Sequence, residues 1–212
     1  MASVAFDLFL PEVLPECPGV PEPVAINAIR NASFDFCRQT LIWSEFKDAA
    51  AYTALTAEYQ VAPPTGAQVV QVVSLALDDG RTLYPSTLDD IVAARPQWQT
   101  HTGPIETFVH SAPGTFRFVA IPENSGTFVA QVAYAPLRTA TSVDERLYNL
   151  YLETIKFGAL WKLKSLTGQS WTDPAAAAAD LQLFNQGIGR AVTDRTRSNS
   201  RASLRVAPQW FA

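Results

Sequence analysis

Two adjacent stretches with helical periodicity, joined by a short polar turn, constrain this chain more than any other feature of its sequence. In the first stretch, apolar residues between Leu147 and Trp161 recur at intervals of three and four, the spacing of one helix face. Before them, Ser142 and Glu145 have the spacing of a capping box. After them, Gly168 can adopt the left-handed conformation that closes a helix. This stretch is therefore predicted to be one long helix.

The second helix follows after a few residues. Thr172-Asp173-Pro174 offers a capping side chain, with proline in the first turn where its missing N–H has no cost. Apolar residues continue from Ala175 to Val192. The sequence from Thr141 to Arg195 therefore predicts two antiparallel helices, an αα-hairpin.

The first of these helices carries apolar residues on more than one face. The second face consists of Leu152, Ile155, Ala159, Leu163 and Leu166. A helix that is apolar nearly all round is normally buried on both sides, which predicts contact with a partner subunit. Ordinary packing inside one bundle is the alternative. Gly158, in mid-helix, costs about 1 kcal/mol relative to alanine, so it predicts a close approach of another helix.

The remaining sequence divides into helical and strand-like parts. A first helix is predicted from Pro21 to about Trp43, whereas residues 53–136 contain valine-rich runs between Pro and Gly turns, typical of antiparallel strands. We predict an α+β fold that is mainly an α-helical bundle, with an inserted small antiparallel β-domain and an extended C-terminal tail. The predicted domains are 1–52 and 137–195 for the bundle, 53–136 for the β-rich insertion and 196–212 for the C-terminal arm.

Charge is distributed unevenly along the chain. The net charge is −4, but from Arg190 onward five arginines face one acid, so this end carries +4 and the remainder −8. Such an end is either a solvated tail or an arm that binds an acidic surface or nucleic acid.

The chain has two cysteines, Cys17 and Cys37. They are more simply explained as buried thiols of a protein in a reducing, cytoplasm-like setting than as a disulfide framework. Neither a leader nor a membrane-spanning run is recognisable.

No pattern in the sequence indicates catalysis. His101 and His110 have no carboxylate or cysteine at ligand spacing, and the nucleophile-elbow, phosphate-loop and dinucleotide-binding motifs are absent. We therefore expect no enzyme activity, no metal and no cofactor.

Several segments together resemble a known family. They are the lead-in Leu10–Pro15, the helix Ala28–Trp43, the segments Tyr151–Leu160 and Trp171–Pro174, and the tail Leu204–Phe211. Their combination and order resemble the head-to-tail connector proteins of tailed bacteriophages, which are also called adaptors.

The resemblance implies a structural virion protein in the neck between capsid and tail, made in the host cytoplasm. It implies a homo-oligomeric ring, commonly a dodecamer, that binds the phage portal protein on one side and a distal tail, nozzle or collar protein on the other. DNA would pass through its channel during genome ejection without sequence-specific binding, and no membrane would be involved. The predicted portal or subunit interface consists of Leu152, Ile155, Ala159, Leu163, Arg195, Arg197, Arg201, Arg205, Val206, Trp210 and Phe211.

Three alternatives remain open at this point. Another neck or tail-completion protein, such as a stopper, would share the small ring but contact the tail tube. A cell-wall hydrolase would use His101 or His110. A nucleic-acid-binding protein would use the arginine-bearing tail, and its affinity for DNA would fall steeply with salt.

Overall fold

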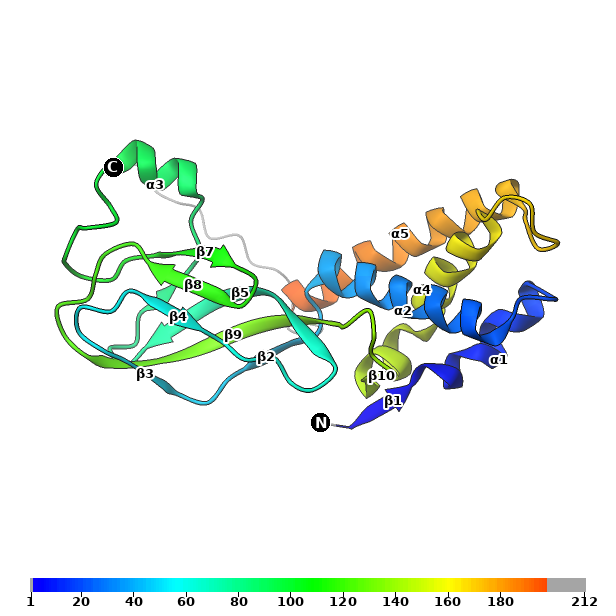
Figure 1. Cartoon of the computed structure of the whole chain (residues 1–212), viewed down its shortest axis with the longest axis horizontal. Helices are drawn as coiled ribbons and strands as arrows, with labels where there is room; N and C mark the ends of the chain where they lie inside the picture. The colour runs from blue at the N-terminus through cyan, green and yellow to red at the C-terminus, as the bar shows by residue number, and fades with distance from the viewer. Residues whose placement is uncertain (1, 198–212) are drawn as a thin grey trace. The chain divides into compact units, whose positions relative to one another are not determined.

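The computed structural model describes residues 2–197, which form two compact units (Figure 1). The β unit comprises Met1–Leu8 and Trp43–Asn149, and the helical unit comprises Phe9–Ile42 and Leu150–Ala212. The elements, in chain order, are β1 (Ser3–Ala5), the 3-10 helix η1 (Phe6–Phe9), α1 (Leu10–Val13), the 3-10 helix η2 (Leu14–Glu16), α2 (Glu22–Thr40), β2 (Ser44–Phe46), β3 (Ala50–Tyr52), β4 (Glu58–Gln60), β5 (Ala67–Leu77), β6 (Thr82–Leu83), α3 (Leu88–Ala94), β7 (Phe108–Ala112), β8 (Thr115–Phe118), β9 (Gly126–Pro136), β10 (Ser142–Asp144), α4 (Glu145–Lys164) and α5 (Pro174–Thr196).

The prediction of a mainly α-helical bundle is wrong. Of the described residues, 41% are helical and 26% lie in strands, which form three sheets, so the fold is α+β without a dominant bundle. The sequence pattern underestimated the strand content because the short edge strands β2, β3 and β4 have three residues each. Runs of that length carry no periodicity that can be recognised. The predicted domain boundaries stay a prediction.

The β unit is organised by two long antiparallel strands, β5 and β9, which pair along their whole length with two register shifts. Beside this pair lie β6 on one edge and β2 and β3 on the other, while β4, β8 and β7 form a second antiparallel sheet. Ala133–Pro136 are buried on both sides of β9, which explains why its sequence alternates only partly.

An aromatic cluster packs the β unit. The Phe116 ring lies 5.4 Å from Phe128 and 5.5 Å from Phe118, both in edge-to-face arrangements. Tyr59 of β4 stacks at 5.9 Å on Phe116. Edge-to-face pairs at these distances stabilise a core beyond their area burial, so the side chains of β4, β8 and β9 are held in one rigid cluster.

The start of α4 differs from the predicted capping box. Ser142 pairs with Ala5 in the small β1–β10 sheet, and the helix begins at Glu145. The capping acceptor is Asp144, whose Oδ1 accepts the Arg146 N–H at 2.9 Å and pairs with Arg146 Nε at 2.9 Å. The buried carboxylate of Asp144 thus takes the capping role that was predicted for Ser142. Further along, α4 is interrupted at Tyr151, whose backbone is not helical.

In the helical unit, α4 and α5 form the predicted αα-hairpin. Asp173 caps α5 by accepting the N–H groups of Ala175 and Ala176, and Gly168 adopts a φ of 77° in the turn. Ring stacking of Trp161 on Phe184 and the contact of Tyr151 with Phe36 of α2 join three helices. The helical hairpin and the cap at Asp173 are therefore confirmed, whereas α4 ends at Lys164, before the predicted end at Gly168.

Candidate interaction surfaces

Two glycines allow the helices of the helical unit to approach closely. A Cβ on Gly158 of α4 would stand 2.8 Å from the Phe184 ring of α5 and 3.0 Å from Ala32 of α2. A Cβ on Gly187 of α5 would stand 2.9 Å from the Cβ of Thr154 in α4. All three separations are shorter than packed carbon atoms allow. The close approach of another helix predicted at Gly158 is confirmed, and the neighbours are Phe184 of α5 and Ala32 of α2.

Ionic contacts join α4 to α5 and to η2 in this unit. Lys164 Nζ of α4 lies 2.8 Å from Asp180 of α5 and 3.5 Å from Glu16 of η2. Glu16 also binds Lys156 Nζ at 2.7 Å. The side chains of Lys164 and Asp180 are only 10% and 9% exposed. An ion pair whose side chains are so little exposed to solvent stabilises the fold only while both partners are present, because removal of one leaves the other as a buried, unpaired charge.

These contacts shift the pKa values of their members. The hydrogen bond from Lys156 is the largest cause that lowers the pKa of Glu16 below its ordinary value. Burial alone would lower the pKa of Lys164, but the hydrogen bond to Asp180 and the nearby carboxylates outweigh it and raise that pKa. Burial raises the pKa of the Cys17 thiol beside this cluster, so the thiol stays protonated at neutral pH.

The shift at Glu16 predicts an acid-dependent loss of stability. Because the pKa is lower in the folded state, the contribution is present above the ordinary value of 4.5 and disappears as pH falls through the folded pKa. The free energy of unfolding, measured by urea titration between pH 6 and pH 3, should decrease more in the wild type than in Glu16→Gln. Since Glu16 is partly exposed, the difference should be small. Parallel curves for the two proteins would contradict this origin.

The structure places the predicted helix-face residues inside the helical unit. Ile155 and Ala159 are 0% exposed and Leu163 is 1% exposed, whereas Leu152 is half-buried. The second apolar face of α4 is therefore largely covered by residues of the same chain. Apolar side chains that reach the surface of α4, the following turn and α5 are Leu150, Leu166 and Leu183. Contact of the predicted set with a portal or a subunit stays a prediction.

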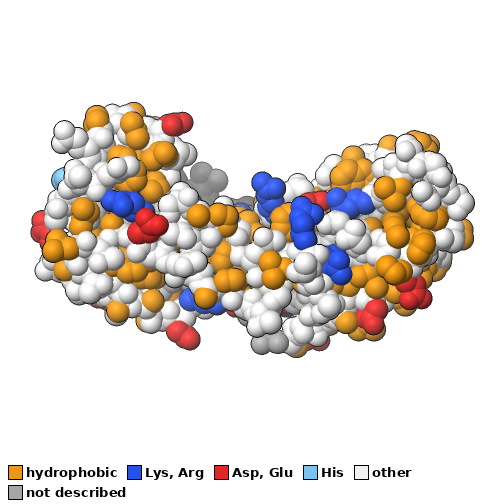
Figure 2. Space-filling view, in the orientation of Figure 1, with side chains coloured by type: hydrophobic (Ala, Val, Ile, Leu, Met, Phe, Trp, Pro, Cys, Tyr) orange, Lys and Arg blue, Asp and Glu red, His pale blue; other side chains and the backbone are white. Residues whose placement is uncertain are grey.

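Arginines gather toward the end of α5. Arg190 is exposed and Arg195 half-buried, and Arg197, at the C-terminal cap, donates its N–H to the Thr193 carbonyl. Figure 2 shows several Lys and Arg side chains together on the visible face of the helical unit. The arginine side chains near the C-terminal end of α5 lie at the negative end of the helix dipole, where a positive charge is favourable. They also make the surface at this end of α5 basic. The other predicted interface residues, Arg201, Arg205, Val206, Trp210 and Phe211, lie outside the described residues.

The two units carry charge of opposite sign. By sequence, the β unit has twelve acids and six bases, a net charge of −6. The helical unit has eight acids and ten bases by sequence, a net charge of +2 that comes from Arg201 and Arg205, which lie outside the described residues. Opposite net charges of this kind steer complementary surfaces of two molecules toward each other.

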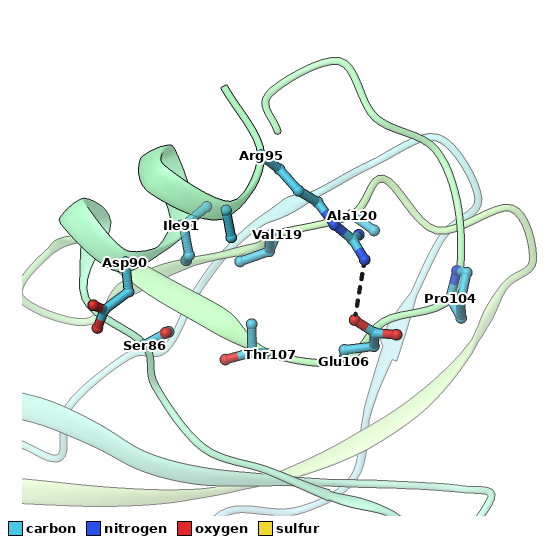
Figure 3. A pocket seen from close by; sticks show the side chains of 10 residues that line it. Ser86, Asp90, Ile91, Arg95, Pro104, Glu106, Thr107, Val119 and Ala120 are labelled. Carbon is cyan, nitrogen blue, oxygen red and sulfur yellow. Dashed lines mark ion pairs between the residues drawn. The ribbon is translucent and has the colours of Figure 1, made fainter. Parts of the chain in front are cut away.

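A pocket of about 320 Å³ opens beside α3 in the β unit (Figure 3). Ile91 and Ala94 of α3 form one wall, and Val119 and Ala120 form another. Thr87 caps α3 by accepting the Asp90 N–H, so the helix is fixed above the pocket. The inward side of Ile91 belongs to a buried cluster with Trp98, Val109 and Val119.

Polar groups surround the opening of this pocket. Arg95 reaches across to Glu106, with Nη2 and Oε2 3.5 Å apart, as the dashed line in Figure 3 marks. Their side chains are 46% and 62% exposed, so this pair is solvated and can exchange partners. The sequence does not indicate this pocket, because Pro104 and Val119 reach it from segments distant from α3 in the chain.

The histidines are not part of a catalytic arrangement that can be recognised. His110 lies on β7 with its ring 5.5 Å from the Phe108 ring, and partial burial lowers its pKa. His101 lies beside Gly103, two residues later in the chain, where an added Cβ would stand 3.4 Å from His101 Nε2. Among residues 2–197, no group of three His, Cys, Asp or Glu side chains is arranged to hold a metal ion. No helix within that range is long and apolar enough to cross a bilayer.

These features define an α+β protein in which the candidate functional sites are surface regions and close contacts between helices. Over residues 2–207 the sequence matches the family described as SU10 adaptor protein, and the chain belongs to that family. A search of curated proteins found no match. The family makes this chain a phage adaptor protein with a structural role in the virion, which implies interaction with portal and tail proteins.

Proposed function

We propose that the protein is a head-to-tail adaptor whose copies form a ring between the portal and the tail. The observation that carries this proposal is the opposite charge of the two units, −6 and +2 by sequence. A ring is built by a heterologous interface, in which one surface of a subunit meets a different surface of its neighbour. An acidic β unit and a C-terminal arm that carries Arg201 and Arg205 without an Asp or Glu would supply two such unlike surfaces.

The ring would surround the channel through which DNA leaves the capsid. A net negative β unit repels phosphates, which suits a passage where DNA must slide. Arg195, Arg197 and the arginines of the C-terminal arm would contact the portal or a neighbouring subunit, where cations and aromatic side chains are effective anchors. A stopper or tail-completion protein is the alternative within the same setting.

The proposal is tested by mixing the purified chain with portal rings and measuring the mass of the product by native mass spectrometry. We expect a fixed number of chains on each portal ring. The double variant Arg195→Glu and Arg197→Glu should weaken this association at least tenfold, because it reverses two predicted interface charges. Arg38→Glu combined with Arg190→Glu changes the net charge equally and should have a much smaller effect.

Two outcomes would contradict the proposal. One is a chain that stays monomeric at every concentration and does not bind portal rings. The other is DNA binding that falls steeply with salt and depends on the arginines of the tail, which would favour a nucleic-acid-binding function.

A further inference from the structure

The α3 pocket has the properties of a receptor for one large side chain. Its volume of about 320 Å³ lies at the lower end of the range for ligand pockets. The walls from Ile91, Ala94 and Val119 are apolar, and α3 presents further apolar surface beside them, since Leu88 and Val92 are 54% and 45% exposed. One aromatic side chain, with apolar neighbours, would cover this surface.

The rim of the pocket favours a basic occupant. Asp90 and Glu106 border it, and the one cation of the rim, Arg95, is already paired with Glu106. The β unit as a whole has a net charge of −6. An incoming arginine would thus find carboxylates at the rim and a favourable field around it.

The sequence of this chain contains a segment with matching chemistry. Residues 198–212 include Arg201 and Arg205, no acid, and the apolar residues Leu204, Val206, Trp210 and Phe211. These fifteen residues follow the end of α5, and an extended chain of that length spans roughly 50 Å. That reach is sufficient for a segment of one copy to extend to another copy.

We propose that the α3 pocket binds residues 198–212 of a second copy of this chain. An aromatic side chain, Trp210 or Phe211, enters the cavity between Ile91 and Val119, and the arginines pair with Asp90 and Glu106. The proposal rests on the proposed function, because it names one of the heterologous contacts that would join neighbours in the ring.

The test measures binding of a fluorescein-labelled peptide of residues 198–212 to the full-length chain by fluorescence anisotropy. We expect saturable binding that weakens as salt is added. Ala94→Trp, which fills the cavity from an exposed position, should reduce the affinity at least tenfold, and so should Trp210→Ala together with Phe211→Ala in the peptide. Ala93→Trp adds the same side chain to α3 outside the pocket lining and should leave the affinity unchanged.

A second variant keeps the test informative if Ala94→Trp does not fold. Glu106→Lys should reduce the affinity and the salt dependence without filling the cavity, and circular dichroism verifies that each variant is folded. Absence of peptide binding, equal losses in Ala93→Trp and Ala94→Trp, or equal binding of a scrambled peptide would overturn the proposal.

The same peptide distinguishes failure of this inference from failure of the proposed function. If it binds portal rings and not this chain, while the intact chain still assembles on portals, the inference is overturned and the adaptor function stands. If the intact chain does not assemble on portals at all but the peptide binds the α3 pocket, the pocket assignment stands and the proposed function fails.

Discussion

Replacement of Asp180 by alanine is expected to destabilise the protein by about 3 kcal/mol, because it leaves the buried Lys164 ammonium without its nearest partner. Lys164 and Asp180 are 2.8 Å apart and both are almost excluded from solvent. Glu16, 3.5 Å from Lys164, remains and keeps the loss at the lower end of the usual range. The melting temperature, followed by circular dichroism at 222 nm, should fall by roughly 6–12 °C.

A double-mutant cycle identifies the cause of this loss. Lys164→Met together with Asp180→Ala removes both charges and should be considerably more stable than Asp180→Ala alone, because no unpaired charge is left between α4 and α5. Asp194→Asn, an exposed acid on the same helix, is the control and should change stability by less than about 0.5 kcal/mol. If the double variant were no better than Asp180→Ala, the loss would come from packing instead.

The helical hairpin could be predicted from the sequence because its signals are local. The cap at Asp173 and the left-handed Gly168 each depend on a few neighbouring residues, and a glycine in the middle of a helix, Gly158, by itself indicates a close approach of another element. The ion pairs between Lys164, Asp180 and Glu16 could not be predicted, since they join residues from three elements. For the same reason, the sequence did not indicate that Ile155 is fully buried within the chain.

In the β unit, the long strands β5 and β9 were predicted, whereas the three-residue strands β2, β3, β4 and β10 were missed. β5 and β9 have eleven residues each, which is sufficient for a strand pattern between turn signals. β10 has three residues, and its Ser142 also fits a helix cap by spacing alone. Only the pairing of β10 with β1 shows that Ser142 belongs to a strand and is not a helix cap. That pairing joins residues more than a hundred positions apart in the chain. The α3 pocket likewise depends on contacts that no local pattern encodes.

Replacement of Gly187 by alanine is expected to destabilise the protein by about 2 kcal/mol, although alanine is the better helix former. The new Cβ would lie 2.9 Å from the Cβ of Thr154. Neither atom can be moved by a change of rotamer, so α4 and α5 must separate and their packing is lost. The free energy of unfolding from urea titration, followed by circular dichroism at 222 nm, measures the effect.

Gly189, two residues later in the same helix, is the matched control. A Cβ there would meet no atom within 4 Å, so Gly189→Ala should stabilise α5 by about 0.5–1 kcal/mol through helix propensity alone. Thr154→Ala combined with Gly187→Ala should recover part of the loss, because it removes the two side-chain atoms beyond the Thr154 Cβ that obstruct the new methyl group. If Gly187→Ala and Gly189→Ala were equally stabilising, α4 and α5 would not be in close contact at this point.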